Sequence, residues 1–230
     1  MWSLYSAVPP TSDIIGGGPR GGKEALNSES KGTNLIITGI GGQGNVMAAT
    51  LLASAILEAG WEVTVGDVYG LTQRGGSVAS HVRWKKGDPL PPLVPQRSLD
   101  ILIAFEPLEA LRILIQFGRE TTRAIVNDRP VLPIGVQAGR LHYPDLKELN
   151  AAIKNLTTET MFTAATSVAT ELGNVQALNM VMLGALYGCG WTPFSANAFE
   201  HTIQSLIPSK FCNLNREAFR KGLTLGTPAH

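Results

Sequence analysis

Residues 35–48 read LIITGIGGQGNVMA, and this stretch indicates how the chain begins to fold. A short β-rich run is followed by four glycines within six residues, and residues 46–57 are then uncharged and mostly apolar. The pattern predicts a strand, a tight turn and a helix. The first amides of such a helix lack partners within it and carry partial positive charge, so the turn suits an anion such as a phosphate. The predicted cofactor-binding residues are Gly39, Gly41, Gly42, Gln43 and Gly44.

Two other interpretations of this turn stay open. Gly39, Gly41 and Gly44 have the spacing of the dinucleotide-binding fingerprint, and Asp67 ends the next predicted strand, where an acid that binds ribose is expected. A free-standing nicotinamide-binding α/β oxidoreductase is therefore an alternative, although the extra Gly42 and the lack of a convincing catalytic set count against it. The glycines could also serve only to pack a strand closely against a helix, as in many unrelated folds.

A second glycine-rich turn follows, because residues 69–76 read YGLTQRGG between two strand-like runs, 63–68 and 78–84. The paired glycines permit a positive φ just before the second run. The arginine at the predicted loop tip could bind a carboxylate, a phosphate or carbonyl groups of a partner, or could simply be solvated. The predicted cleft-lining or partner-facing residues are Tyr69, Gln73, Arg74, Gly75 and Gly76.

The rest of the chain alternates between strand-like and helix-like segments. Strands are predicted at residues 99–105, 122–127 and 161–165, and helices after residue 106 and at 145–155, 174–187, 195–206 and 214–223. This alternation predicts an α/β fold, a three-layer α/β/α sandwich around a mostly parallel, mixed sheet in which residues 77–84 run antiparallel to the preceding strand. The helix after residue 106 is expected to cover the sheet with Leu108, Leu111 and Ile115.

The chain divides into three predicted regions. Residues 1–32 form a flexible Gly/Pro-rich extension, residues 33–226 a single domain, and residues 227–230 a tail. The extension does not resemble a secretory signal, because its first basic residue is Arg20 and prolines interrupt its apolar residues. An uncharged stretch at residues 172–199 contains too many polar residues, glycines and prolines for a membrane span.

Charge and cysteine content exclude several classes of function. The chain has 19 basic and 18 acidic residues, so it offers no electrostatic footprint for nucleic acid or an anionic membrane. A [4Fe–4S] cluster takes four thiolates, and this chain has only Cys189 and Cys212. Unpaired cysteines suit a reducing, cytoplasmic location. No metal site and no catalytic residue is identified, and His81 is interpreted as a structural histidine.

Four motifs together resemble one family. The chain contains GIGGQG at 39–44, YGLTQRGGSV at 69–78, FEPLEALR at 105–112 and NMVMLGAL at 179–186. In this order they resemble the gamma-type domain of the 2-oxoacid:ferredoxin oxidoreductases, from about residue 33 to residue 226. Pyruvate and 2-oxoglutarate members usually carry GPEMRGG in the second turn, whereas this chain has GLTQRGG. The difference favours an aryl-pyruvate type, such as the small subunits of the indolepyruvate ferredoxin oxidoreductases.

The resemblance implies a non-cluster subunit of a heteromeric enzyme, active only with its large subunit. The family decarboxylates a 2-oxoacid on thiamine diphosphate, passes electrons through iron–sulfur clusters to ferredoxin and transfers the acyl group to coenzyme A. Thiamine diphosphate and the clusters are expected in the large partner, and the complex is expected to pair two heterodimers. The glycine turn would then meet coenzyme A or protein groups, and Arg74 would meet charge. A non-catalytic assembly subunit is the remaining alternative.

Overall fold

The computed structural model of the chain describes residues 32–70, 76–132, 136, 139 and 142–227. Predicted site residues Gln73, Arg74 and Gly75 lie outside these ranges, as do nearly all of the predicted extension and most of the predicted tail. Strands in the described part form one sheet in the order β2-β3-β1-β4-β5-β6. Their bounds are Thr33–Ile40 (β1), Glu62–Tyr69 (β2), Ser77–Lys85 (β3), Ile101–Ala104 (β4), Arg123–Asn127 (β5) and Glu159–Thr163 (β6).

The strand directions agree with the predicted mixed sheet. β1, β4, β5 and β6 run parallel to one another, whereas β3 is antiparallel to both of its neighbours, β1 and β2. The central register aligns Ile37 of β1 with Ser80 of β3 and Ile103 of β4. β1 and β4 are almost wholly buried because both of their faces are covered, which explains their continuous apolar sequences.

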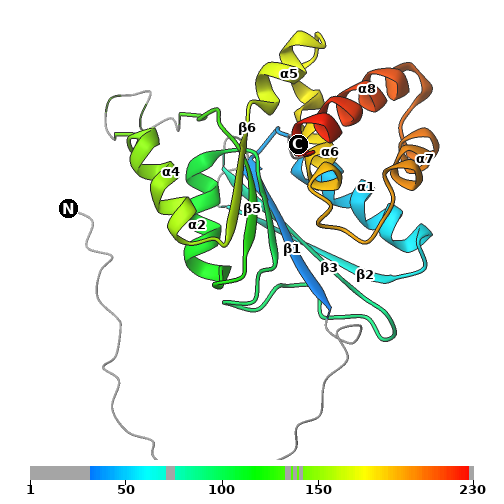
Figure 1. The fold of residues 1–230 in the computed structure, drawn as a ribbon, viewed down its shortest axis with the longest axis horizontal. Coiled ribbons are helices and arrows are strands. Elements are labelled where there is room, and N and C mark those ends of the chain that lie inside the picture. The colour runs from blue at the N-terminus through cyan, green and yellow to red at the C-terminus, as the bar shows by residue number, and fades with distance from the viewer. Residues whose placement is uncertain (1–31, 71–75, 133–135, 137–138, 140–141, 228–230) are drawn as a thin grey trace, which may run out of the picture.

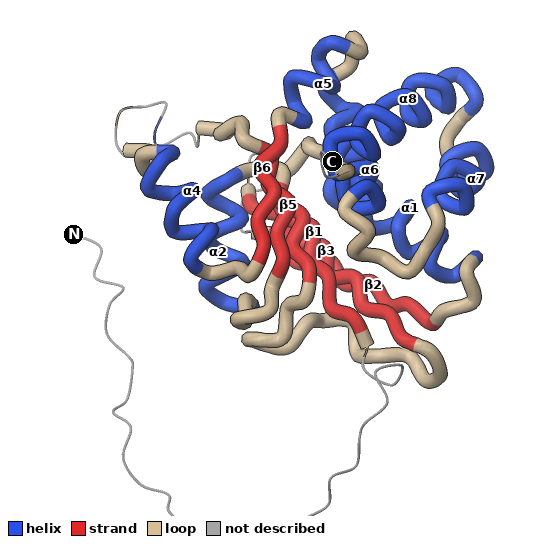
Figure 2. The backbone as a smooth tube through the Cα atoms, viewed as in Figure 1, coloured by secondary structure: helices blue, strands red, loops and turns tan. Residues whose placement is uncertain are grey.

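Helices cover both faces of the sheet, which confirms the three-layer sandwich (Figures 1 and 2). Helices α2 and α4 lie on one face, and α1, α6, α7 and α8 lie on the other with the short helix α5. The helices run over Asn45–Glu58 (α1), Pro107–Phe117 (α2), Leu146–Asn155 (α4), Ala165–Glu171 (α5), Leu178–Gly188 (α6), Ala196–Leu206 (α7) and Ser209–Gly226 (α8). A 3₁₀ turn, η2, covers Val175–Ala177 just before α6.

Helix α2 begins as predicted but faces the sheet with a different side. Pro107 occupies its first turn, and the buried face includes Ala110, Ile113 and Leu114. Ile115, expected in the buried stripe, is 70% exposed, so that part of the prediction was wrong. The acidic N-terminal end explains the difference, because Glu106 and Glu109 both point inward and so set the rotation of the helix about its axis.

Two boundaries also differ from those expected. The predicted helix at 174–187 is divided into η2 and α6, because Asn174 caps the 3₁₀ turn through its side chain. Helix α8 starts directly after Pro208 rather than at Leu214, since its polar first turn carried no apolar signal. The added turn contains the exposed Phe211, which lines the larger of two hollows beside the glycine turn.

His81 is a buried structural residue in β3, as the sequence indicated. Its Nδ1 atom accepts a hydrogen bond from the Val94 amide at 3.1 Å, and its ring packs edge-on against Phe117. Burial lowers the pKa of His81; the charge of Arg83 lowers it further, and the charge of Asp67 opposes this shift. The folded protein therefore holds this imidazole neutral.

Protonation of His81 makes folding sensitive to mild acid. Below about pH 6.5 the unfolded chain binds a proton at this residue that the folded chain does not. The free energy of unfolding therefore decreases as the pH is lowered, and it levels off below the folded-state pKa. We expect His81→Gln to lose this part of the pH dependence. Urea titrations of both proteins between pH 7.5 and 5 measure it, and identical slopes would contradict the assignment.

Candidate functional site

Both glycine-rich turns lie at one edge of the sheet. β1 and β2 run in the same direction because each is antiparallel to β3, so the residues after their carboxyl ends meet. The Gly41 amide donates to the Gly76 carbonyl at 2.9 Å, which joins the two turns directly. Tyr69, the last residue of β2, is 62% exposed beside them. This edge is the side on which open α/β sheets bind ligands.

The first turn needs glycine at two positions. Gly42 and Gly44 have φ angles of 102° and 85°, a region that disfavours side chains. Gly44 is the N-cap residue of α1, and a Cβ atom there would lie 2.7 Å from Nδ2 of Asn179 in α6. Since glycine offers no capping side chain, the first helical amides find no acceptor among the described residues. The turn therefore presents amide donors, as predicted.

Two amides of the predicted anion cradle are already engaged. Gly41 donates to Gly76, and the Gln43 amide donates to the Ile40 carbonyl at 3.2 Å. The amides of Gly42 and Gly44 make no such bond within the described part of the chain. In segment 41–44, only the amides of Gly42 and Gly44 lack an acceptor among the described residues. These two amides and the first amides of α1 are therefore the candidates for the predicted anion contact.

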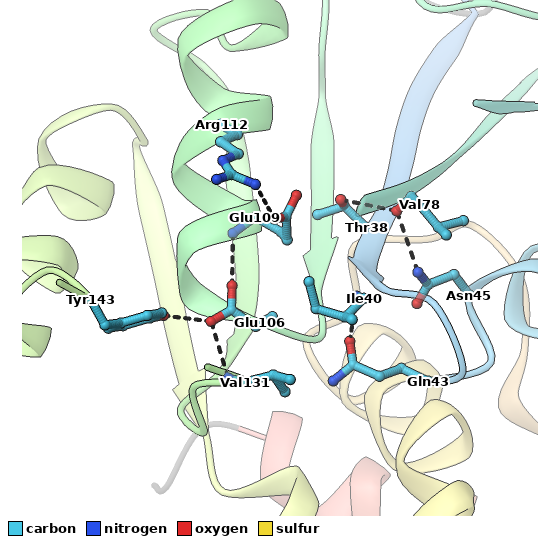
Figure 3. A network of polar contacts seen from close by, with 10 residues as sticks. All are labelled: Thr38, Ile40, Gln43, Asn45, Val78, Glu106, Glu109, Arg112, Val131 and Tyr143. Carbon is cyan, nitrogen blue, oxygen red and sulfur yellow. Dashed lines mark hydrogen bonds and ion pairs between the residues drawn. The ribbon is translucent and has the colours of Figure 1, made fainter. Parts of the chain in front are cut away.

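The Gln43 side chain braces the turn from inside. Its Oε1 accepts from the Ile40 amide at 2.7 Å (Figure 3). Its Nε2 donates to the Phe105 carbonyl at 3.2 Å. Gly39 makes room for this arrangement, because a Cβ atom there would lie 2.5 Å from Oε1 of Gln43. Gln43 therefore links the ends of β1 and β4 and shapes the turn through its side chain.

The contact between Gly39 and Gln43 predicts coupled substitutions. Gly39→Ala should push the Gln43 side chain out of the turn and cost about 2 kcal/mol, from lost hydrogen bonds and overpacking. In a Gln43→Ala background the same substitution should cost less than about 1 kcal/mol, because its main obstacle is gone. Denaturant unfolding of the two single variants and the double variant measures the coupling. Strict additivity would place the strain elsewhere.

A second amide continues this network across the sheet edge. Asn127, at the end of β5, is fully buried, and its Nδ2 donates to the same Phe105 carbonyl at 3.1 Å and to Oγ1 of Thr166 at 2.9 Å. Its Oδ1 accepts from the Thr166 amide at 3.1 Å, which fixes the start of α5. Sequence reasoning missed both residues, although an Asn that ends a buried strand is a usable signal.

Glu106 fastens the edge beyond β4. One carboxylate oxygen accepts from the Glu109 amide at 2.9 Å; the other accepts from the Val131 amide at 3.3 Å and the Tyr143 hydroxyl at 2.5 Å (Figure 3). Burial and the neighbouring carboxylate raise the pKa of Tyr143 far above its ordinary value, so its hydroxyl stays a donor. These contacts favour a structural role for Glu106, as the cap of α2 and the acceptor that holds the segment after β5.

Two hollows flank the glycine turn, and Gly42 and Gln43 line both. The larger, about 700 Å³, is mostly apolar, and the smaller is about 380 Å³. Residues of the larger include Val46, Met47, Leu206, Ile207, Pro208 and Phe211. The smaller is lined by Arg129, Thr166, Thr170 and Gln176 among others.

Asp67 does not occupy the position that a nicotinamide site requires. In a dinucleotide-binding fold the ribose-binding acid ends the strand beside the first strand. Here β3 separates β2 from β1, and Asp67 accepts from Oγ of Ser80 at 2.5 Å on the edge strand. The nicotinamide alternative thus loses its second supporting feature.

Neither a metal-binding cluster nor a membrane-spanning helix is found in the described part of the chain. Among the described residues, no group of three or more His, Cys, Asp or Glu side chains is placed to hold a metal ion. Within the same residues, no helix has the length and apolarity that a membrane crossing requires.

One protein-family model matches almost the whole described domain. The sequence model of the pyruvate ferredoxin/flavodoxin oxidoreductase family matches residues 34–225. An indolepyruvate oxidoreductase subunit IorB of Archaeoglobus fulgidus is 36% identical over 82% of this chain and 92% of its own length. Its namesake from Pyrococcus horikoshii is 37% identical over 83% of this chain and 94% of its own length.

Comparison with solved structures supports the fold. The gamma subunit of a keto/oxoacid ferredoxin oxidoreductase from Geobacter sulfurreducens aligns with a TM-score of 0.62 and 21% identity, over 84% of this chain and 98% of that one. A 2-oxoglutarate:ferredoxin oxidoreductase from Magnetococcus marinus, whose structure holds 2-oxoglutarate, coenzyme A and succinyl-CoA, aligns with a TM-score of 0.65 and 21% identity. That alignment covers 86% of this chain and 31% of the larger chain.

Proposed function

The chain belongs to the pyruvate ferredoxin/flavodoxin oxidoreductase family, and from this premise we propose that it is the small, cluster-free subunit of an aryl-pyruvate:ferredoxin oxidoreductase. As a member it is an oxidoreductase subunit of the 2-oxoacid:ferredoxin type. The proposed substrate is indolepyruvate or a similar aryl-pyruvate, which the complex would decarboxylate oxidatively to the acyl-CoA. Support comes from the relatives named as indolepyruvate oxidoreductase subunits and from the YGLTQRGG turn.

Thiamine diphosphate and the iron–sulfur clusters are proposed for the larger partner subunit. The residues of this chain do not fit a cluster, because it has two cysteines and burial raises the pKa of the Cys189 thiol to about 11. No step of the reaction is therefore assigned to a cluster on this chain. In our proposal, ferredoxin receives the electrons from the partner, and two heterodimers pair in the cytoplasm.

This chain would contribute the coenzyme A side of the active-site cleft. The observation that carries this proposal is the glycine turn, which lines both hollows and whose Gly42 and Gly44 amides, like the first amides of α1, have no acceptor among the described residues. Phosphate is the anion that such donors suit. The larger, apolar hollow on the other side of the turn could hold the less polar part of the same molecule. Arg74 and Gln73 remain candidates for contacts with the ligand or the partner.

Co-purification tests this proposal. The tagged chain should be isolated from its native host together with a large, cysteine-rich, thiamine-binding subunit, and the complex should reduce ferredoxin with indolepyruvate in a coenzyme A-dependent manner. A non-catalytic assembly role is the second candidate, and paired substitutions Gln73→Ala and Arg74→Ala separate the two. Lost turnover in an intact complex supports a cleft role, whereas turnover that falls only in step with subunit dissociation supports assembly.

A further inference from the structure

The charge that lines the smaller hollow is positive. Among the described residues that line this hollow, Arg129 is the only charged one, and no described side chain forms an ion pair with its guanidinium group. The remaining polar lining comes from Gln43, Thr166, Thr170 and Gln176. A guanidinium that is free to offer its fork of donors within a concave surface attracts an anion.

Thr166 adds a buried hydroxyl to this hollow. The residue is only 7% exposed. Oγ1 accepts a hydrogen bond from Nδ2 of Asn127, and the hydroxyl can in addition donate one. The hydroxyl hydrogen has no acceptor within the described residues. The neighbouring Thr170 differs, because its hydroxyl donates to the Thr166 carbonyl of its own helix.

The sheet edge holds these groups rigidly in relation to the glycine turn. The Phe105 carbonyl accepts from both Gln43 and Asn127, so the turn and α5 are tied to one atom. The segment after β5 is fixed in turn, because the Val131 amide donates to Glu106 two residues beyond Arg129. Arg129 after β5, Thr166 in α5 and Gly42 in the turn thus line one hollow.

We propose that this hollow is a phosphate-binding subsite in which Arg129 supplies the charge, Thr166 a directed hydroxyl and Gly42 a backbone amide. A phosphate offers more acceptor oxygens to a guanidinium, a hydroxyl and a backbone amide together than a carboxylate does. The identity of the ligand rests on the proposed function, which makes a phosphate of coenzyme A the occupant. The residues of the subsite follow β1, follow β5 and belong to α5.

Calorimetric titration of the full chain with adenosine 3′,5′-bisphosphate tests the subsite without turnover. The wild-type chain should bind this probe, more weakly at higher ionic strength, and should not bind adenosine to a comparable extent. Arg129→Ala should lower the affinity at least about tenfold, and Arg129→Lys should fall between. Lys147→Ala, which removes an exposed charge from α4 on the other face of the sheet, should bind like wild type. Equal affinity of Arg129→Ala and wild type overturns the proposal, as does absence of binding to wild type.

Kinetics of the assembled complex identify the source of the anion. Arg129→Ala should raise the KM for coenzyme A at least about tenfold and leave the KM for the 2-oxoacid within about twofold. A raised KM for the 2-oxoacid alone overturns the phosphate assignment in favour of a carboxylate. A complex that binds the bisphosphate through Arg129 yet does not oxidise 2-oxoacids refutes the proposed function and leaves the subsite standing.

Discussion

Gly184→Ala is expected to destabilise the protein by about 3 kcal/mol or more, although alanine normally favours a helix over glycine by about 1 kcal/mol. The reason is the packing of α6 against α8. A Cβ atom on Gly184 would lie 2.1 Å from the Phe219 carbonyl oxygen, and one on Gly222 would lie 2.0 Å from the Val181 carbonyl oxygen. Both obstacles are backbone atoms, which cannot rotate aside, so the helices must separate.

The same close backbone contact recurs one turn further along both helices. Gly188 and Gly226 follow the first pair by one helical turn, and added Cβ atoms there would lie 2.3 Å from the carbonyl oxygens of Leu223 and Ala185. Four glycines thus allow two backbones to approach over two turns. Separation would also affect the site, because α6 carries Asn179 against Gly44 of the glycine turn.

Denaturant unfolding measures the effect of these substitutions. Ala151→Gly, on the exposed side of α4, is the control for helix propensity and should cost about 1 kcal/mol. The double variant Gly184→Ala/Gly222→Ala should cost less than the sum of its parts, because one separation of the helices relieves both clashes. Stabilisation by Gly184→Ala would show that the two helices do not pack this closely.

The order of strands and helices and the mixed sheet could be predicted because the local sequence signals for these elements are strong. The uncharged run after the first turn indicated a helix, and it is α1. Gly75 and Gly76 before an alternating strand indicated the reversal at β3 that makes the sheet mixed. Pro107 after an apolar strand marked the first turn of α2 correctly.

Side-chain direction is what the sequence could not provide. The prediction that Gln43 binds a cofactor rested on the turn, and it did not reveal that the side chain hydrogen-bonds to Ile40 and Phe105, which depends on the distance between β1 and β4. No sequence signal marks Arg129, because it follows a strand in a short proline-containing segment with no motif. Its importance depends on Thr166, which lies 37 residues later and approaches only through the pairing of β5 with β6.

Glu106→Ala is the second substitution with a large expected effect, about 3 kcal/mol of lost stability. The carboxylate is 1% exposed and accepts from Glu109, Val131 and Tyr143. Its removal leaves three donors without an acceptor, and each buried unsatisfied group costs about 1–3 kcal/mol before local rearrangement or water reduces the total. Tyr143→Phe removes one donor only and should cost about 1 kcal/mol.

The same substitution links stability to the site. Val131 lies two residues beyond Arg129, so release of its amide should loosen the segment that carries the guanidinium. We expect Glu106→Ala to weaken binding of adenosine 3′,5′-bisphosphate at a temperature where the variant remains folded, and Tyr143→Phe, which keeps the Val131 bond, to bind nearly as wild type. Calorimetry beside circular dichroism separates the two effects. Undiminished affinity in a folded Glu106→Ala variant would mean that Arg129 is positioned by β5 alone, and Glu106 would then be a purely structural residue of the β4–α2 corner.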